Sequence, residues 1–171
     1  RKICMANNTL MSKMAQEETG LGRWEDKVLK NELGINKTPG VEDIVSEAYS
    51  DDHGLTLVER APYGVIGSIT PSTNSTVTII SNDIGMISGG NSVVFNPHPS
   101  AKKVSCFIIS LINKATFEAG GPANLVTCID EPTIESAKEL MSNKKIAIMV
   151  VTGGPAVVRT AMNSGKKVIG A

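Results

Sequence analysis

The segment Ala147-Ile148-Met149-Val150-Val151-Thr152-Gly153-Gly154-Pro155 decides the fold class. Its first five residues are apolar without polar alternation, which indicates a strand buried on both faces. Two glycines then form a turn, and Pro155 suits the first position of a helix because its missing N–H has no helical partner there. A buried strand that runs through a short turn into a helix is typical of a parallel α/β sheet.

The same succession of strand and helix recurs along residues 61–171. Between the strands, apolar residues spaced three and four apart predict the connecting helices. Because crossovers between parallel strands are right-handed, we expect a doubly wound parallel sheet with helices on both faces. The strands are predicted at Val65–Ile69, Ser92–Phe95, Leu125–Ile129, Ala147–Val151 and Val168–Ile169.

A change in composition separates residues 1–60 from this α/β part. The first 60 residues hold 8 Lys and Arg with 11 Asp and Glu, whereas the other 111 hold 9 and 6. We therefore predict charged N-terminal helices with one edge strand over 1–60, packed on an α/β domain over 61–171. The spacing of Val41, Ile44, Val45 and Ala48 predicts a helix there, and Leu55–Val58 is predicted to be a strand that pairs at an edge, within the chain or with another subunit.

Composition excludes several classes of function. The 171 residues carry 17 Lys and Arg against 17 Asp and Glu, so no basic surface for nucleic acid or for membrane lipids is expected. The longest apolar run, Ile146–Val151, is far shorter than the roughly 20 residues of a membrane span. The three cysteines form no CxxC pair, which argues against a zinc site and favours a reduced, cytoplasmic protein. Cys106 and Cys128 are interpreted as small packing residues rather than nucleophiles.

Ligands of open parallel sheets bind beyond the carboxyl ends of the strands, so the loops there are candidate sites. In the loop Thr152-Gly153-Gly154-Pro155, free N–H groups at the start of a helix would face an anion such as a phosphate. A tight turn without a ligand explains the same residues. Asn74, after the first strand, is either a hydrogen-bond donor to a developing oxyanion or the cap of the next helix. His98, between two prolines, is either a ligand contact or a surface residue.

Several segments together resemble the aldehyde dehydrogenase superfamily, and within it the CoA-acylating acetaldehyde and propionaldehyde dehydrogenases of ethanolamine and propanediol breakdown. The resemblance extends over essentially the whole chain and several separate loops. The matching segments are Ala61–Gly67, Thr70–Asn74, Gly89–Lys102, Gly120–Leu125, Val151–Pro155 and Gly165–Ala171.

The resemblance implies a role for each loop of an NAD(P)-binding, Rossmann-like domain that residues 61–171 hold in part. Asn74 matches the amide of the oxyanion hole. The cofactor-binding positions are Thr70 and Pro71 on the nicotinamide side, Phe95, Asn96, Pro97 and His98 near the adenosine ribose, Gly121 and Pro122 on the adenine side, and Thr152, Gly153 and Gly154 near the pyrophosphate.

The implied reaction converts an aldehyde, NAD and coenzyme A into acyl-CoA and NADH. The family's nucleophilic cysteine lies in a second domain, and none of the three cysteines here matches it, so the chain alone is expected to be inactive. The resemblance also implies a homo-oligomer and a cytoplasmic location, often inside a bacterial microcompartment. Two other interpretations stay open: a module that binds a nucleotide or CoA without chemistry, and an interaction protein whose charged helices over 1–50 dock a partner.

Overall fold

A parallel sheet of five strands lies at the centre of the structure, a computed structural model that describes residues 1–171. The strand order is β5-β4-β3-β6-β7, with a separate two-stranded sheet formed by β1 and β2. The elements are α1 (Lys2–Ala6), α2 (Asn8–Thr19), α3 (Trp24–Lys37), the 3-10 turn η1 (Val41–Asp43), β1 (Glu47–Asp51), β2 (Gly54–Val58), β3 (Val65–Thr70), α4 (Ser75–Ser88), β4 (Ser92–Pro97), the 3-10 turn η2 (Pro99–Ala101), α5 (Lys102–Glu118), β5 (Val126–Cys128), α6 (Ile134–Ser142), β6 (Ile146–Val151), α7 (Pro155–Met162) and β7 (Lys167–Gly170).

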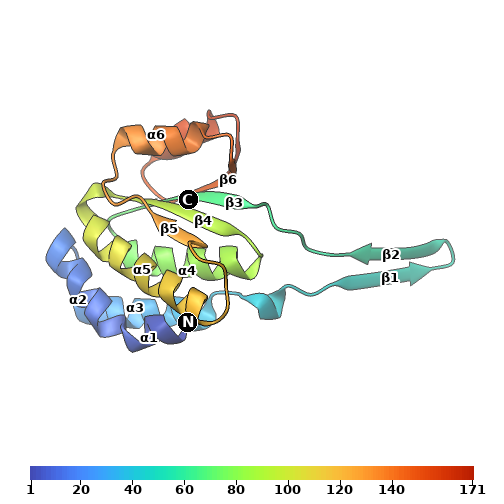
Figure 1. Cartoon of the computed structure of the whole chain (residues 1–171), viewed down its shortest axis with the longest axis horizontal. Helices are drawn as coiled ribbons and strands as arrows, with labels where there is room; N and C mark the ends of the chain where they lie inside the picture. Colours follow the sequence, from blue (N-terminus) through green and yellow to red (C-terminus); the bar gives the residue numbers. More distant parts are fainter.

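Helices cover both faces of this sheet, as the sequence predicts. Helices α4 and α5 lie on one face, with α1, α2 and α3 outside them, and α6 lies on the other (Figure 1). The chain proceeds from β3 to β4 and β5 in one direction, then returns through α6 to place β6 on the opposite side of β3. All four pairs of neighbouring strands are parallel. The fold is therefore doubly wound, and the direction of winding reverses between β3 and β6.

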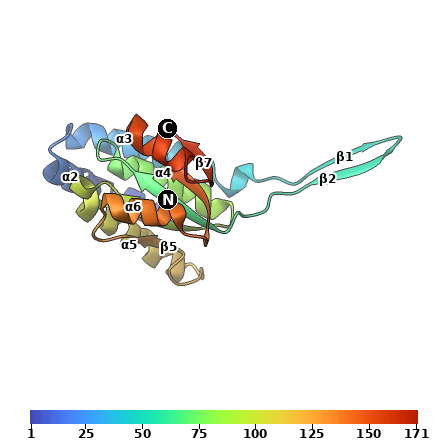
Figure 2. The ribbon, with the colours of Figure 1, turned by 90° about the horizontal axis from the view of Figure 1, so that it is seen from above.

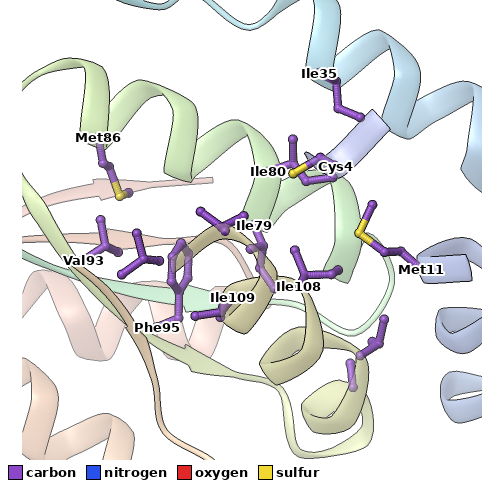
Figure 3. Packing of buried hydrophobic residues seen from close by; sticks show 14 of the residues in the cluster. Cys4, Met11, Ile35, Ile79, Ile80, Met86, Val93, Phe95, Ile108 and Ile109 are labelled. Atoms are coloured by element: carbon purple, nitrogen blue, oxygen red, sulfur yellow. The ribbon is translucent and has the colours of Figure 1, made fainter. Parts of the chain in front are cut away.

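The larger part of the core fills the space between the sheet and its helices α4 and α5. Phe95 is fully buried, and Figure 3 shows its ring among Val93, Ile79 and Ile109. Met11 and Ile35 extend the same cluster outward to α2 and α3. A second cluster, which includes Leu140, Met149 and Ala161, lies between the other face and α6 and α7. Two apolar layers thus hold β3 and β4 in place from both sides.

The helix predicted over residues 41–48 is wrong. Residues Val41–Asp43 form only one 3-10 turn, and Glu47–Asp51 form a strand that pairs antiparallel with Gly54–Val58. The hairpin extends away from the rest of the molecule (Figure 2), so its strands join neither edge of the central sheet. The helical spacing gives a wrong prediction because no other element packs against these residues: Val41 is 70% exposed and Val45 is 59% exposed.

The N-terminal helices bury a more polar face than their leucine spacing suggests. Leu29 and Leu33 are 67% and 62% exposed, whereas Asn31 and Ile35 on the same helix are buried. Buried amides and hydroxyls bond to one another across α2, α3 and α4, as described below. No helix in the structure combines the length and the apolar character that crossing a bilayer requires.

Candidate functional site

A pocket of about 730 Å³ opens at the carboxyl ends of β3, β4 and β6. It includes the point between β3 and β6 where the winding of the sheet reverses, which is where open α/β sheets bind their ligands. Its lining residues are Ile69, Thr70, Pro71, Ser72, Thr73, Asn74, Asn96, Pro97, His98, Pro99, Thr133, Ile134, Ala137, Thr152, Gly153, Gly154, Val157 and Ala171. Loops from three strands that lie far apart in the sequence therefore meet around one cavity.

Thr70 ends β3 at the wall of this pocket. The residue is only 2% exposed, and its Oγ1 hydroxyl has no hydrogen-bond partner within the chain. A buried hydroxyl without a partner is unfavourable in a protein that binds nothing at that place. Thr70 therefore places an unsatisfied hydroxyl at the wall of the pocket.

Asn74 occupies the N-cap position of α4 but does not act as a cap. Its side chain makes no hydrogen bond to the first turn of the helix. Instead, Oδ1 accepts a hydrogen bond of 3.0 Å from the Lys30 ammonium, and Nδ2 donates to nothing within the chain. Of the two interpretations that the sequence left open, the structure disfavours the cap and leaves an amide donor at the pocket.

The turn between β6 and α7 offers fewer free donors than its sequence suggests. The Thr152 N–H donates to Ile69 O, and the Gly153 N–H donates to Ala171 O, each at 3.0 Å. The Gly154 N–H donates to no acceptor in the chain, and α7 begins at the next residue, Pro155. The anion site predicted for this turn is thus reduced to the Gly154 N–H and the first turn of α7.

Asn96 and His98 line the pocket from the end of β4. The Asn96 Oδ1 accepts a hydrogen bond of 2.7 Å from the Ser136 hydroxyl, which ties β4 to the start of α6. His98 caps the turn η2, because its Nδ1 accepts the Ser100 N–H at 3.2 Å. With Nδ1 as an acceptor, the neutral ring carries its proton on Nε2. His98 is therefore a capping residue that also presents an N–H donor on an exposed ring.

Three of the predicted cofactor residues do not reach the pocket. The Phe95 side chain is 0% exposed in the core. Gly121 and Pro122 lie in the loop that precedes β5, so they occupy the opposite edge of the parallel sheet from the pocket. We correct the expectation for all three residues: the Phe95 side chain is enclosed by the core, and Gly121 and Pro122 precede a strand, whereas only a loop that follows a strand reaches the carboxyl edge.

Helix α6 also contributes to the site, although no residue of it was among the expected site residues. Thr133, Ile134 and Ala137 line the pocket. Thr133 also caps α6, since its hydroxyl accepts the Ser136 N–H at 3.0 Å. The loop after β5, Asp130 to Thr133, follows a strand just as the other site loops do. Its position in the chain was the signal that could have found it.

None of the three cysteines lines the pocket. Cys4 on α1 is buried, and burial raises the pKa of its thiol. Cys106 and Cys128 are half-buried with their sulfur atoms 3.1 Å apart. Burial, with a smaller effect of the Cys106 sulfur, raises the pKa of the Cys128 thiol strongly. None of the three sulfur atoms belongs to a residue that lines the cavity, so the pocket carries donors but no nucleophile of this chain.

Residues 35–170 match the sequence profile of the Aldehyde dehydrogenase family, and the chain belongs to that family. Among its relatives, the propanal dehydrogenase (CoA-propanoylating) of Salmonella typhimurium is 50% identical over 165 residues, which cover 95% of this chain and 36% of that protein. The chain thus spans about a third of the length of this curated relative.

Two solved structures show the same architecture. The crystal structure of Rhodopseudomonas palustris propionaldehyde dehydrogenase with bound CoA and an acylated cysteine has a TM-score of 0.96 at 50% identity, covering 100% of this chain and 39% of that one. An engineered glycolyl-CoA reductase with bound NADP+ has a TM-score of 0.95 at 48% identity, covering 100% of this chain and 40% of that one.

Proposed function

We propose that this chain forms the dinucleotide-binding part, and supplies an oxyanion donor, of an enzyme that converts a short aldehyde, NAD+ and CoA into acyl-CoA and NADH. The observation that supports it most directly is the pocket in which Thr70, Asn74 and Gly154 bring three unused hydrogen-bond donors to the strand ends. The relatives supply the reaction class, since they include a CoA-propanoylating propanal dehydrogenase and a protein with bound NADP+.

The residues present fit a dinucleotide. The Thr70 hydroxyl is a buried donor without a partner, and a Cβ built on Gly154 would meet nothing within 4 Å, so a phosphate can approach the backbone there. In this proposal, Thr70 and Pro71 hold the nicotinamide side, Asn96, Pro97 and His98 hold the ribose, and Gly154 with the first turn of α7 holds the pyrophosphate. A bound nicotinamide dinucleotide would supply the hydride acceptor.

Asn74 acts on the substrate carbonyl in this scheme. When a thiolate adds to an aldehyde, the carbonyl oxygen gains a negative charge, and a fixed N–H donor stabilises that charge more than it stabilises the neutral aldehyde. The free Nδ2 of Asn74 is such a donor. The nucleophilic thiolate and the CoA site would lie in a part of the protein that corresponds to the part of the relatives that this chain does not match. We call this chain together with that remaining part the complete enzyme.

The unpartnered Thr70 hydroxyl can be tested by measuring NAD+ affinity and melting temperature in the same variant. Thr70→Val keeps the shape of the side chain and removes the hydroxyl. We expect weaker NAD+ binding by calorimetric titration, together with an unchanged or raised melting temperature, because the hydroxyl has no partner in the free protein.

Ser105→Ala is the matched control. Ser105 is also buried with an unpartnered hydroxyl, but it lies on α5 and does not line the pocket. It should change the melting temperature in the same direction and leave NAD+ affinity unchanged. Equal affinities of the wild type and Thr70→Val for both NAD+ and NADP+ would remove Thr70 from the site, and tight binding of CoA instead would favour a module that binds CoA without chemistry.

A further inference from the structure

Lys30 contacts the pocket residue Asn74 from a helix that contributes no residue to the pocket lining. It lies on α3, and its Nζ donates to Asn74 Oδ1 across 3.0 Å, although the two residues are 44 positions apart in the sequence. Both side chains are exposed at the surface. An exposed contact of this kind contributes little to folding stability, so we consider its effect on the orientation of the Asn74 amide.

The chemistry of the two groups fixes the orientation of the Asn74 amide. An asparagine amide presents either its oxygen or its NH2 group on a given side, and rotation by half a turn exchanges them. An ammonium group has three donors and no acceptor, so it can face only the oxygen. With Oδ1 held by Lys30, the NH2 group is turned to the other side. Contact with a cation also draws electron density toward Oδ1, which makes the N–H groups stronger donors.

A row of contacts between α3 and α4 holds Lys30 at this place. Asn31 accepts a hydrogen bond of 2.7 Å from the Thr76 hydroxyl, and its own amide donates to Asn8 and Ser12 at 2.9 and 3.1 Å, all among buried residues. One turn later, Gly34 lies directly against Val77.

The row ends where the Thr38 hydroxyl donates to Ser81 at 3.1 Å. From Lys30 to Thr38 the partners advance along α4 in the same direction, so the two helices run side by side in a fixed register. The middle of α3, at Lys30 and Asn31, is therefore held against the start of α4, where Asn74 lies.

We propose that Lys30 is a positioning residue that turns the Asn74 amide so that its NH2 group, and not its oxygen, faces the reacting carbonyl. The proposal rests on the function proposed above. Lys30 does not touch the substrate in this scheme, so every effect of changing it must pass through Asn74.

The sharpest test changes the charge at residue 30 in the complete enzyme. In Lys30→Glu, the new carboxylate accepts hydrogen bonds and attracts the NH2 group of Asn74, which turns the amide oxygen toward the carbonyl. We expect kcat to fall by about 100-fold, close to the loss of an oxyanion donor, with the aldehyde KM little changed. Lys30→Met only releases the amide, so its loss should be smaller, about threefold to tenfold, and Lys30→Arg should restore most of the activity.

Two controls separate positioning from structure and from charge. Lys27→Met removes the same charge from the same helix but breaks no contact with Asn74, and it should leave kcat near the wild-type value. In an Asn74→Ala background, Lys30→Glu should have no further effect on kcat, because the group on which it acts is gone. Thermal melting of each variant confirms that the folded enzyme is compared.

The possible outcomes are distinct. Losses that multiply in the Lys30→Glu/Asn74→Ala double variant, or equal losses for Lys27→Met and Lys30→Met, overturn the positioning role and leave the proposed function standing. A parent enzyme that forms no NADH from aldehyde and CoA overturns the proposed function, and the role of Lys30 with it.

Discussion

The side chain of Asn74 has its oxygen bonded to Lys30 and its nitrogen unused at the pocket, so its contribution to catalysis and to stability can be separated. In the complete enzyme, Asn74→Ala should lower kcat by about 100- to 1,000-fold, as the loss of an oxyanion donor typically does. Stability should change little, because the amide makes no cap bond to α4.

Asn74→Asp sharpens this contrast. The aspartate keeps the contact with Lys30 and caps helices well, but it places a negative charge against a developing oxyanion. Steady-state rates beside thermal melting should show a stable and nearly inactive protein. Near-normal turnover would contradict the oxyanion role.

Gly154 is expected to matter for the ligand and not for the fold. Its φ of −65° and ψ of 161° suit any residue, and a Cβ there has open space around it. Gly154→Val should therefore fold normally but bind NAD+ more weakly, because its side chain blocks access to the free N–H.

The neighbouring glycine behaves in the opposite way. A Cβ on Gly153 would lie 2.8 Å from Val157 Cγ1, so Gly153→Ala should destabilise the turn itself. Calorimetric titration and melting of both variants check the pair. Equal NAD+ affinity of Gly154→Val and the wild type would place the phosphate elsewhere.

Asp83 should make the stability depend on pH. It is 7% exposed, its Oδ1 has no partner, and burial raises its pKa to about 7. Because the folded state then holds its proton up to a higher pH than the unfolded state, stability should fall as the pH rises from about 4 to 7. Each unit of raised pKa corresponds to about 1.4 kcal/mol.

Asp83→Asn should remove this dependence and be more stable than the wild type at pH 8. Urea unfolding of both proteins at pH 5 and pH 8 measures the difference. Identical pH profiles for the two proteins would show that Asp83 ionises in the folded state as freely as in water.

The packing of α3 on α4 depends on one residue without a side chain. A Cβ on Gly34 would lie 2.6 Å from Val77 Cγ2, and a β-branched side chain in a helix has little freedom to move away. Gly34→Ala should destabilise the fold by about 1–3 kcal/mol through overpacking, despite the better helix propensity of alanine. It should also lower kcat of the complete enzyme, by moving Lys30 away from Asn74.

Gly85→Ala on α4 is the control for this element. Gly85 also lies inside a helix, but a Cβ there would meet nothing within 4 Å. That variant should be neutral or stabilised by up to about 1 kcal/mol. If urea unfolding shows the same change for both variants, α3 and α4 are not held together at Gly34.

The elements of the α/β part could be predicted from sequence because local pattern and burial agree there. Continuous apolar strands such as 147–151 and the turn before Pro155 identify β6 and α7 without any tertiary information. Residues 41–48 lack that agreement, since their helical spacing meets no packing partner and the Asp-Asp-His-Gly turn closes a hairpin instead.

Contacts between segments that lie far apart in the sequence could not be predicted from local pattern. Nothing near Asn74 in the sequence points to Lys30, because the contact depends on how α3 packs on α4. The pocket loops are predictable from the rule that ligands bind beyond the carboxyl ends of parallel strands. That rule excludes Gly121 and Pro122, which precede a strand, and includes Thr133, which follows one.

At the scale of the whole molecule, the pocket offers donors without a nucleophile. We expect the isolated chain to form no NADH from an aldehyde and CoA, since no cysteine of the chain lines the pocket. Absorbance at 340 nm in the presence of propanal, NAD+ and CoA measures this, with the complete enzyme as the positive control. CoA-dependent turnover by the pure chain would contradict the proposal that the nucleophile lies outside this chain. The predicted self-association and the predicted location inside a microcompartment stay predictions.

The two strands that pair with the central strand β3, β4 and β6, are synthesised at different times. Val65 pairs with Ser92 of β4 on one side and with Ile146 of β6 on the other. The edge toward β4 can close soon after β4 has been synthesised, whereas the edge toward β6 waits until residues 146–151 have emerged. Closing the longer loop costs more chain entropy, and an open strand edge can meanwhile pair with other nascent chains. Since the pocket includes the boundary between β3 and β6, the ligand site is completed only after β6 has followed β4 out of the ribosome.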